Sequence, residues 1–165
     1  METGVKGRPG GDGGASAVEF ALVVPLLLLL VFGIINFGLI FASQISLNSA
    51  ARDAARAGVV APLTGSALTC SAIATAARSN AGTIGAPASA VAVTVTGPTG
   101  TTCTLAAGSA TVTGSGAGST PCTGSSSSAA QLAVVLTSNY KSPVPLVPPA
   151  TLTQTATGKF QCEYS

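Results

Sequence analysis

The 165-residue sequence has no histidine and no tryptophan, and charged residues make up only 7% of it. Without histidine the chain has no Ser-His-Asp triad, no histidine-ligated metal site and no histidine-based acid–base catalysis. Its net charge of +2 provides no basic surface of the kind that binds nucleic acid. Low charge together with 47% hydrophobic residues also argues against a disordered polyelectrolyte. We therefore expect a membrane or surface protein that is not an enzyme and has no cofactor, metal or small-molecule substrate.

The hydrophobic residues are concentrated in one run. No charged residue lies between Glu19 and Arg52, and the most apolar part is Phe20 to Ala42, FALVVPLLLLLVFGIINFGLIFA. As a helix this part would be about 34 Å long, enough to cross a hydrocarbon layer of ~30 Å. A buried helix of a soluble domain is the alternative, but the remaining sequence offers little apolar mass to cover it. We predict a transmembrane helix with a kink or local distortion at Pro25, whose ring leaves the carbonyl of Ala21 without a donor.

The helical pattern continues beyond the apolar run. Residues 43–59, SQISLNSAARDAARAGV, favour helix, and Asp53 and Arg56 are spaced for an i, i+3 pair. This predicts one continuous helix of roughly 40 residues, about 60 Å long, with an apolar first half and an amphipathic second half. A membrane anchor alone needs no such extension, so the second half must pack against something.

The segment before the span is polar and unusual. Residues 1–14, METGVKGRPGGDGG, include Lys6 and Arg8 and end in two glycines directly before ASAVEF. A secretory signal peptide would have a shorter apolar region, followed by small residues at its cleavage site. Here the small residues come first. Glu19 stands at the edge of the uncharged run, where a carboxylate is costly, so it is a candidate functional residue. A glutamate that reaches the headgroups as an ordinary helix flank is the alternative.

This arrangement resembles the class III signal of type IV-type pilins: a short basic leader ending in glycine, four residues, glutamate, an aromatic residue and a hydrophobic helix. More narrowly, residues 7–58, with ASAVEFALVVPLLLLLVFGIINFG and AARDAARAG, are similar to the TadE-like family of tight-adherence (Flp-type) pseudopilins. The resemblance implies that a prepilin peptidase cleaves between Gly14 and Ala15, and that Glu19 and Phe20 act in assembly. It also implies an assembly platform, an ATPase and other pilin subunits as partners.

The resemblance favours a structural role. A major Flp pilin would largely end near the helix, so the long segment that follows favours a minor pilin or pseudopilin of the pilus. After cleavage, Glu19 of one subunit could pair with the Ala15 amine of its neighbour, which would neutralise both charges in a low-dielectric layer. The alternative is a surface binding module that stays anchored in the membrane permanently.

All cysteines follow the span: Cys70, Cys103, Cys122 and Cys162. They show no C-x2-C spacing, and the chain has no histidine, which argues against a zinc site and for disulfides formed in an oxidising compartment. The basic residues on the two sides of the span are equal in number, so the cysteines set the orientation. We expect a single-pass protein of the bacterial cytoplasmic membrane with a cytoplasmic N-terminus and an extracytoplasmic C-terminal part. Of the three possible pairings, Cys103–Cys122 with Cys70–Cys162 is favoured.

We predict an α+β fold in which a small, disulfide-linked antiparallel domain of three or four strands packs on one short helix. The chain divides into a leader (1–14), a transmembrane and assembly helix (15–60) and a Ser/Thr/Ala/Gly-rich ectodomain (61–165). Alternation of apolar residues and turn signals give these expected elements: a helix at 66–80, strands at 89–96, 110–113, 131–138 and 151–164, a flexible loop at 114–128 and a proline-rich connector at 142–149.

Overall fold

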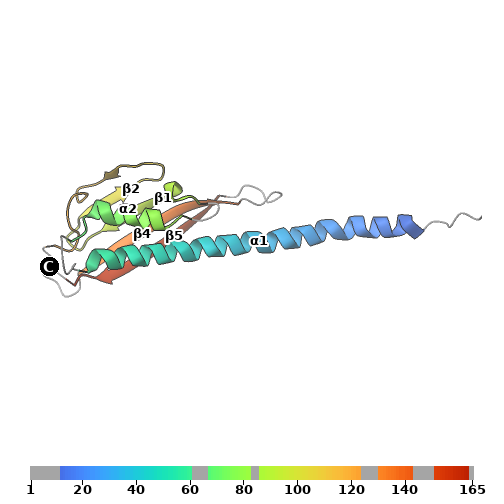
Figure 1. Ribbon diagram of the computed structural model, residues 1–165, viewed down its shortest axis with the longest axis horizontal. Helices are drawn as coiled ribbons and strands as arrows, with labels where there is room; N and C mark the ends of the chain where they lie inside the picture. The colour runs from blue at the N-terminus through green and yellow to red at the C-terminus, as the bar shows by residue number, and fades with distance from the viewer. Residues whose placement is uncertain (1–11, 61–66, 83–85, 124–129, 143–150, 164–165) are drawn as a thin grey trace, which may run out of the picture. The chain divides into compact units, whose positions relative to one another are not determined.

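The computed structural model describes residues 12–60, 67–82, 86–123, 130–142 and 151–163 (Figure 1). Within these residues the elements are α1 (Asp12–Val59), α2 (Cys70–Asn80), the 3-10 helix η1 (Ala88–Ala90), β1 (Val91–Thr96), β2 (Thr102–Leu105), β3 (Val112–Thr113), β4 (Gln131–Lys141) and β5 (Thr151–Gln161). A long apolar helix followed by an antiparallel sheet, a short helix and two disulfides confirms the predicted α+β class.

Helix α1 is continuous and belongs to both of the compact units into which the chain divides, 1–35 and 36–165. It is the one helix among the described residues that is long and apolar enough to cross a membrane, and none of its most apolar window is buried. Pro25 lies inside α1, and the helix continues on both sides of it. The kink expected at Pro25 stays a prediction. The helix also begins before Gly14, so the predicted cleavage position lies in its first turn.

The sheet has the strand order β3-β2-β1-β4-β5, and every neighbouring pair is antiparallel. Alternate residues of β1 and β4 are buried on one face, as the alternation in the sequence predicts: Val91, Val93, Val95, Leu132, Val134 and Leu136. Strand β2 was not predicted. It has only four residues between two turns, too few for an alternating pattern to stand out.

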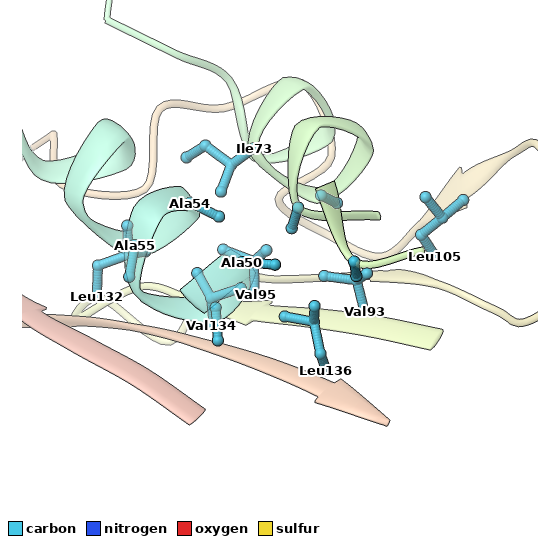
Figure 2. Packing of buried hydrophobic residues seen from close by; sticks show 14 of the residues in the cluster. Ala50, Ala54, Ala55, Ile73, Val93, Val95, Leu105, Leu132, Val134 and Leu136 are labelled. Carbon is cyan, nitrogen blue, oxygen red and sulfur yellow. The ribbon is translucent and has the colours of Figure 1, made fainter. Parts of the chain in front are cut away.

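Two helices, rather than the one expected, cover the buried face of the sheet. Figure 2 shows Ala50, Ala54 and Ala55 of α1 and Ile73 of α2 above the valines and leucines of the strands. The amphipathic half of α1 thus packs on the sheet of its own chain. This is the packing partner that the sequence analysis expected for the part of the helix beyond the apolar run. Helix α2 starts at Cys70, later than predicted, because the Thr69 hydroxyl caps it by accepting the Ala72 N–H (3.3 Å).

Small residues bring α1 very close to the sheet. Ala51 and Ala55 are fully buried, and a Cβ built at Gly158 of β5 would overlap the backbone carbonyl of Ala51. A Cβ at Gly58 would lie 2.5 Å from Leu132 Cδ2 and 2.7 Å from Ile73 Cδ1. Helix and strand therefore meet backbone to backbone at Gly158, with no side chain there that could rotate away.

The disulfides are Cys70–Cys103 and Cys122–Cys162, so the favoured pairing was wrong. Their Cα–Cα distances, 6.2 and 5.7 Å, are ordinary for a disulfide. The favoured pairing assumed a short local loop, but the fold brings the start of α2 next to β2 and the loop after β3 next to the end of β5. Cys122 tethers the loop after β3 through its disulfide, whereas residues 124–128 and the connector residues 143–149 lie outside the described residues.

The close approach at Gly158 predicts a strong effect of a single methyl group. Gly158→Ala should destabilise the folded unit by about 1–3 kcal/mol, because only a backbone shift can relieve the overlap with Ala51. Thermal unfolding of the full chain in detergent, followed by circular dichroism, measures this effect. Gly118→Ala is the matched control, since a Cβ there meets nothing within 4 Å. Equal melting temperatures for the two variants would contradict the backbone contact.

Candidate functional site

The predicted processing and assembly residues lie together at the start of α1. Gly14, Ala15, Glu19 and Phe20 are all helical and exposed. Ala15 and Glu19 are four residues apart, and so lie one above the other on the same face of the helix. The geometry is compatible with the roles predicted for these residues, but it tests neither cleavage nor assembly.

The rest of the first half of α1 is apolar on all sides. Large side chains around the whole helix are mostly exposed in the single chain: Leu22, Val23, Leu26, Leu29 and Ile34 are each at least 60% exposed. A helix that is hydrophobic all round is stable only when lipid or other protein surrounds it. Among the described residues the chain provides no such cover, and a helix of this kind suggests a membrane anchor.

The second half of α1 is fixed to β5 by polar contacts that the sequence analysis did not predict. We call the contact set formed by Ile40, Ser43, Gln44 and Ala51 of α1 with Gln154, Thr155 and Gly158 of β5 the α1–β5 interface.

Gln154 is the centre of the α1–β5 interface and is only 4% exposed. Its Oε1 accepts a hydrogen bond from Ser43 Oγ (2.7 Å), and its Nε2 donates to the carbonyl of Ile40 (3.0 Å). Gln44 Nε2 donates to the backbone carbonyl of Thr155 (3.1 Å). Only one feature of the sequence could have indicated this contact. Gln154 is two residues before Ala156, so in a strand both side chains lie on the same face of the sheet.

Asn36 of α1 is bonded to the residue that follows β4: Ser142 Oγ donates to Asn36 Oδ1 (2.7 Å). The only clearly polar side chain in the apolar run is thus satisfied within its own chain. The residues of α1 that follow lie beside the ends of β4 and β5. Phe37, Ile40, Phe41 and Leu152 line a shallow hollow of 260 Å³ there.

Two buried hydroxyls near this end of β4 have no hydrogen-bond partner among the described residues: Ser138 Oγ and Tyr140 Oη. Tyr140 is the largest fully buried side chain, and burial raises the pKa of its phenol. Both side chains lie on the face of the sheet that the helices cover.

Arg78 of α2 is a structural clamp rather than a reactive group. Its guanidinium donates to the backbone carbonyls of Leu105, Ala106 and Ser109, which fixes the turn after β2 to the helix. Burial lowers the pKa of Arg78, although an arginine stays protonated at any physiological pH.

The described residues contain no group of three or more His, Cys, Asp or Glu side chains that could hold a metal ion. The four cysteines are paired in disulfides. A second open hollow, of 520 Å³, lies beside the end of β5 and is lined by Arg56, Val60, Phe160 and Glu163 among others.

Residues 14–56 match the family model described as TadE-like protein, which confirms the resemblance for this part of the chain. The family suggests a protein associated with the tight-adherence (Flp-type) pilus. No curated protein and no solved structure matches the chain. The matched residues comprise almost all of α1, and therefore both its exposed apolar half and its half packed on the sheet.

The polar contacts of the α1–β5 interface predict an energetic coupling between Ser43 and Gln154. A double-mutant cycle of Ser43→Ala and Gln154→Leu should give a coupling of about 0.5–1.5 kcal/mol, the usual net contribution of a hydrogen bond. Chemical denaturation of the full chain in detergent measures it. The control cycle combines Ser43→Ala with Thr153→Ala and should give no coupling. Thr153 is exposed and lies on the other face of β5. Similar values in the two cycles would show that the Ser43–Gln154 bond contributes nothing specific.

The raised pKa of Tyr140 predicts a loss of stability at alkaline pH. The buried phenol is favoured in its neutral form, so its stabilising effect is complete below the unfolded value of about 10 and is lost as the pH rises above it. Unfolding free energies measured between pH 8 and pH 11 should fall for the wild type and fall less for Tyr140→Phe. Parallel pH profiles for the two proteins would rule out Tyr140 as the titrating group.

Proposed function

We propose, from the TadE-like match of residues 14–56, that this protein is a minor pilin or pseudopilin of a Flp-type tight-adherence pilus. The observation that carries the proposal is the division of α1. Its first half is apolar on all sides and is not covered by any of the described residues, while its second half is fixed to the ectodomain. A helix of this kind can anchor the subunit in the bilayer and can equally pack among the helices of other subunits.

Processing by a prepilin peptidase between Gly14 and Ala15 belongs to this proposal. Cleavage would remove the polar leader and would expose the α-amine of Ala15 at the start of the apolar helix. Glu19 lies one turn further along. Within one helix the two groups belong to the same subunit, but between adjacent subunits a Glu19 carboxylate could pair with the neighbour's Ala15 amine and offset the cost of placing both charges near lipid.

The proposed topology places the leader in the cytoplasm and the sheet domain outside the cytoplasmic membrane. Support comes from the two disulfides, both in residues after the span, since such bonds form and persist in oxidising compartments. The proposed partners are the membrane, the prepilin peptidase, other pilin subunits and the assembly platform.

We propose a structural role rather than a catalytic one. The polar groups that the fold brings together, at Gln154 and at Arg78, bond to the protein's own backbone and side chains. A permanently anchored surface binding module is the second candidate. It needs an anchor, but it needs neither leader removal nor a carboxylate at the edge of the span.

The proposal predicts that Glu19→Ala separates assembly from anchoring. In cells that make the pilus, the variant should insert into the membrane normally, and mass spectrometry should find a mature N-terminus at Ala15. Its amount in sheared pili should fall strongly, because the neighbour's amine would be left unpaired. Glu163→Ala, which removes an exposed acid of the ectodomain, is the matched control and should enter pili like the wild type. A mature chain that still starts at Met1, or wild-type incorporation of Glu19→Ala, would favour the permanent anchor.

A further inference from the structure

The end of the folded unit at which α1 first meets the sheet carries exposed apolar side chains. We call this the entry end and define it by Phe37, Phe41, Lys141 and Leu152. Phe37 and Phe41 are one turn apart on α1 and are 70% and 60% exposed, while Leu152, the second residue of β5, is 44% exposed. Together with Ile40 they line the hollow of 260 Å³.

The length of the apolar helix decides what covers this end. Residues 20–35, between Glu19 and the Asn36 side chain that bonds Ser142, rise only about 24 Å as a helix, whereas the hydrocarbon layer is ~30 Å thick. About four more residues are needed, and these extend to Leu39, next to Ile40. The carbonyl of Ile40 already accepts a hydrogen bond from Gln154 of β5. A hydrocarbon layer that begins after Glu19 therefore extends along α1 to the residues that lie beside β5.

The polar side chains of α1 and β5 that meet at this height are paired within the chain, although the buried hydroxyls of Ser138 and Tyr140 on β4 have no partner among the described residues. Asn36 accepts from Ser142, and the amide of Gln154 is bonded to both Ser43 and Ile40. Buried polar groups are tolerated at low dielectric only when they are hydrogen-bonded. The one charge at the entry end is Lys141, the exposed last residue of β4, whose long side chain can reach lipid phosphates.

We propose that the entry end is seated in the outer leaflet of the bilayer while the subunit is anchored there. Phe37, Phe41 and Leu152 contact the upper acyl chains. Lys141 lies one residue nearer the span than Leu152, and its long side chain extends back to the headgroups. The ectodomain is therefore partly embedded in the lipid rather than suspended above it on the helix. The inference rests on the proposed membrane span of α1.

The absence of tryptophan makes a direct test possible. Phe41→Trp and Leu152→Trp each create a single fluorophore at the entry end, on two different elements. The full chain is reconstituted into phosphatidylcholine–phosphatidylglycerol vesicles with acyl chains brominated near the headgroup, and into unbrominated vesicles. Phe160→Trp is the matched control, because Phe160 is 37% exposed and lies about 27 Å further along β5 at ~3.4 Å per residue. Phe32→Trp, within the span, reports on the membrane position of α1.

The expected result is loss of fluorescence in brominated vesicles for the tryptophans at 41, 152 and 32, and none for that at 160. If the tryptophan at 32 is quenched and those at 41 and 152 are not, the inference fails while the membrane span stands. If the latter two emit at short wavelength without quenching, a second copy covers the entry end instead of lipid. An unquenched tryptophan at 32 would overturn the span, and with it the anchoring in the proposed function. Circular dichroism of each variant identifies misfolding, and the two entry-end positions serve as independent tests of each other.

Discussion

The structure depends on one close contact, the backbone of α1 against the backbone of β5. Gly158 leaves no room for a side chain over Ala51, and the amide of Gln154 joins the helix to the strand two turns earlier. Because these contacts involve backbone and a buried amide, the second half of α1 cannot slide or rotate on the sheet without losing them. The ectodomain is thus tied to a fixed set of residues on the helix, and the residue at which the helix becomes free of the sheet is also fixed.

That constraint gives the two halves of one helix different chemistry. After Asn36, alanine and glycine are favourable, since they let the helix lie close to a sheet of valines and leucines. Before Asn36 the helix has no such partner among the described residues, and leucine, valine and phenylalanine are exposed on every side. The small core that results contains few large side chains. The two disulfides, which join α2 to β2 and the loop after β3 to the end of β5, compensate for this by restricting the unfolded chain.

Much of this architecture could be predicted from the sequence because it follows from the spacing of apolar residues along the chain. The continuous helix and the inward valines of β1 follow from local patterns, and the TadE-like match, residues 14–56, lies within that helix. The unpredicted features depend on tertiary position. The pairing Cys70–Cys103 can be predicted only if α2 is known to lie over β2. That strand has four residues, too few for a recognisable alternating pattern. A glutamine in a strand is usually exposed. Gln154 is buried and accepts a hydrogen bond from Ser43 because α1 packs over it, which the local sequence does not indicate.

The same division bears on how a subunit could leave the bilayer for a filament. Lipid tails are about as apolar as leucine, so moving residues 20–35 from lipid to a bundle of similar helices changes their hydrophobic free energy little. The preference for one environment must then come from groups that lipid cannot satisfy. In the proposed assembly these are Glu19 and the Ala15 amine, which remain separate charges in a lone subunit and neutralise each other between neighbours. In this proposal the apolar helix makes both environments accessible, and the carboxylate of Glu19 selects between them.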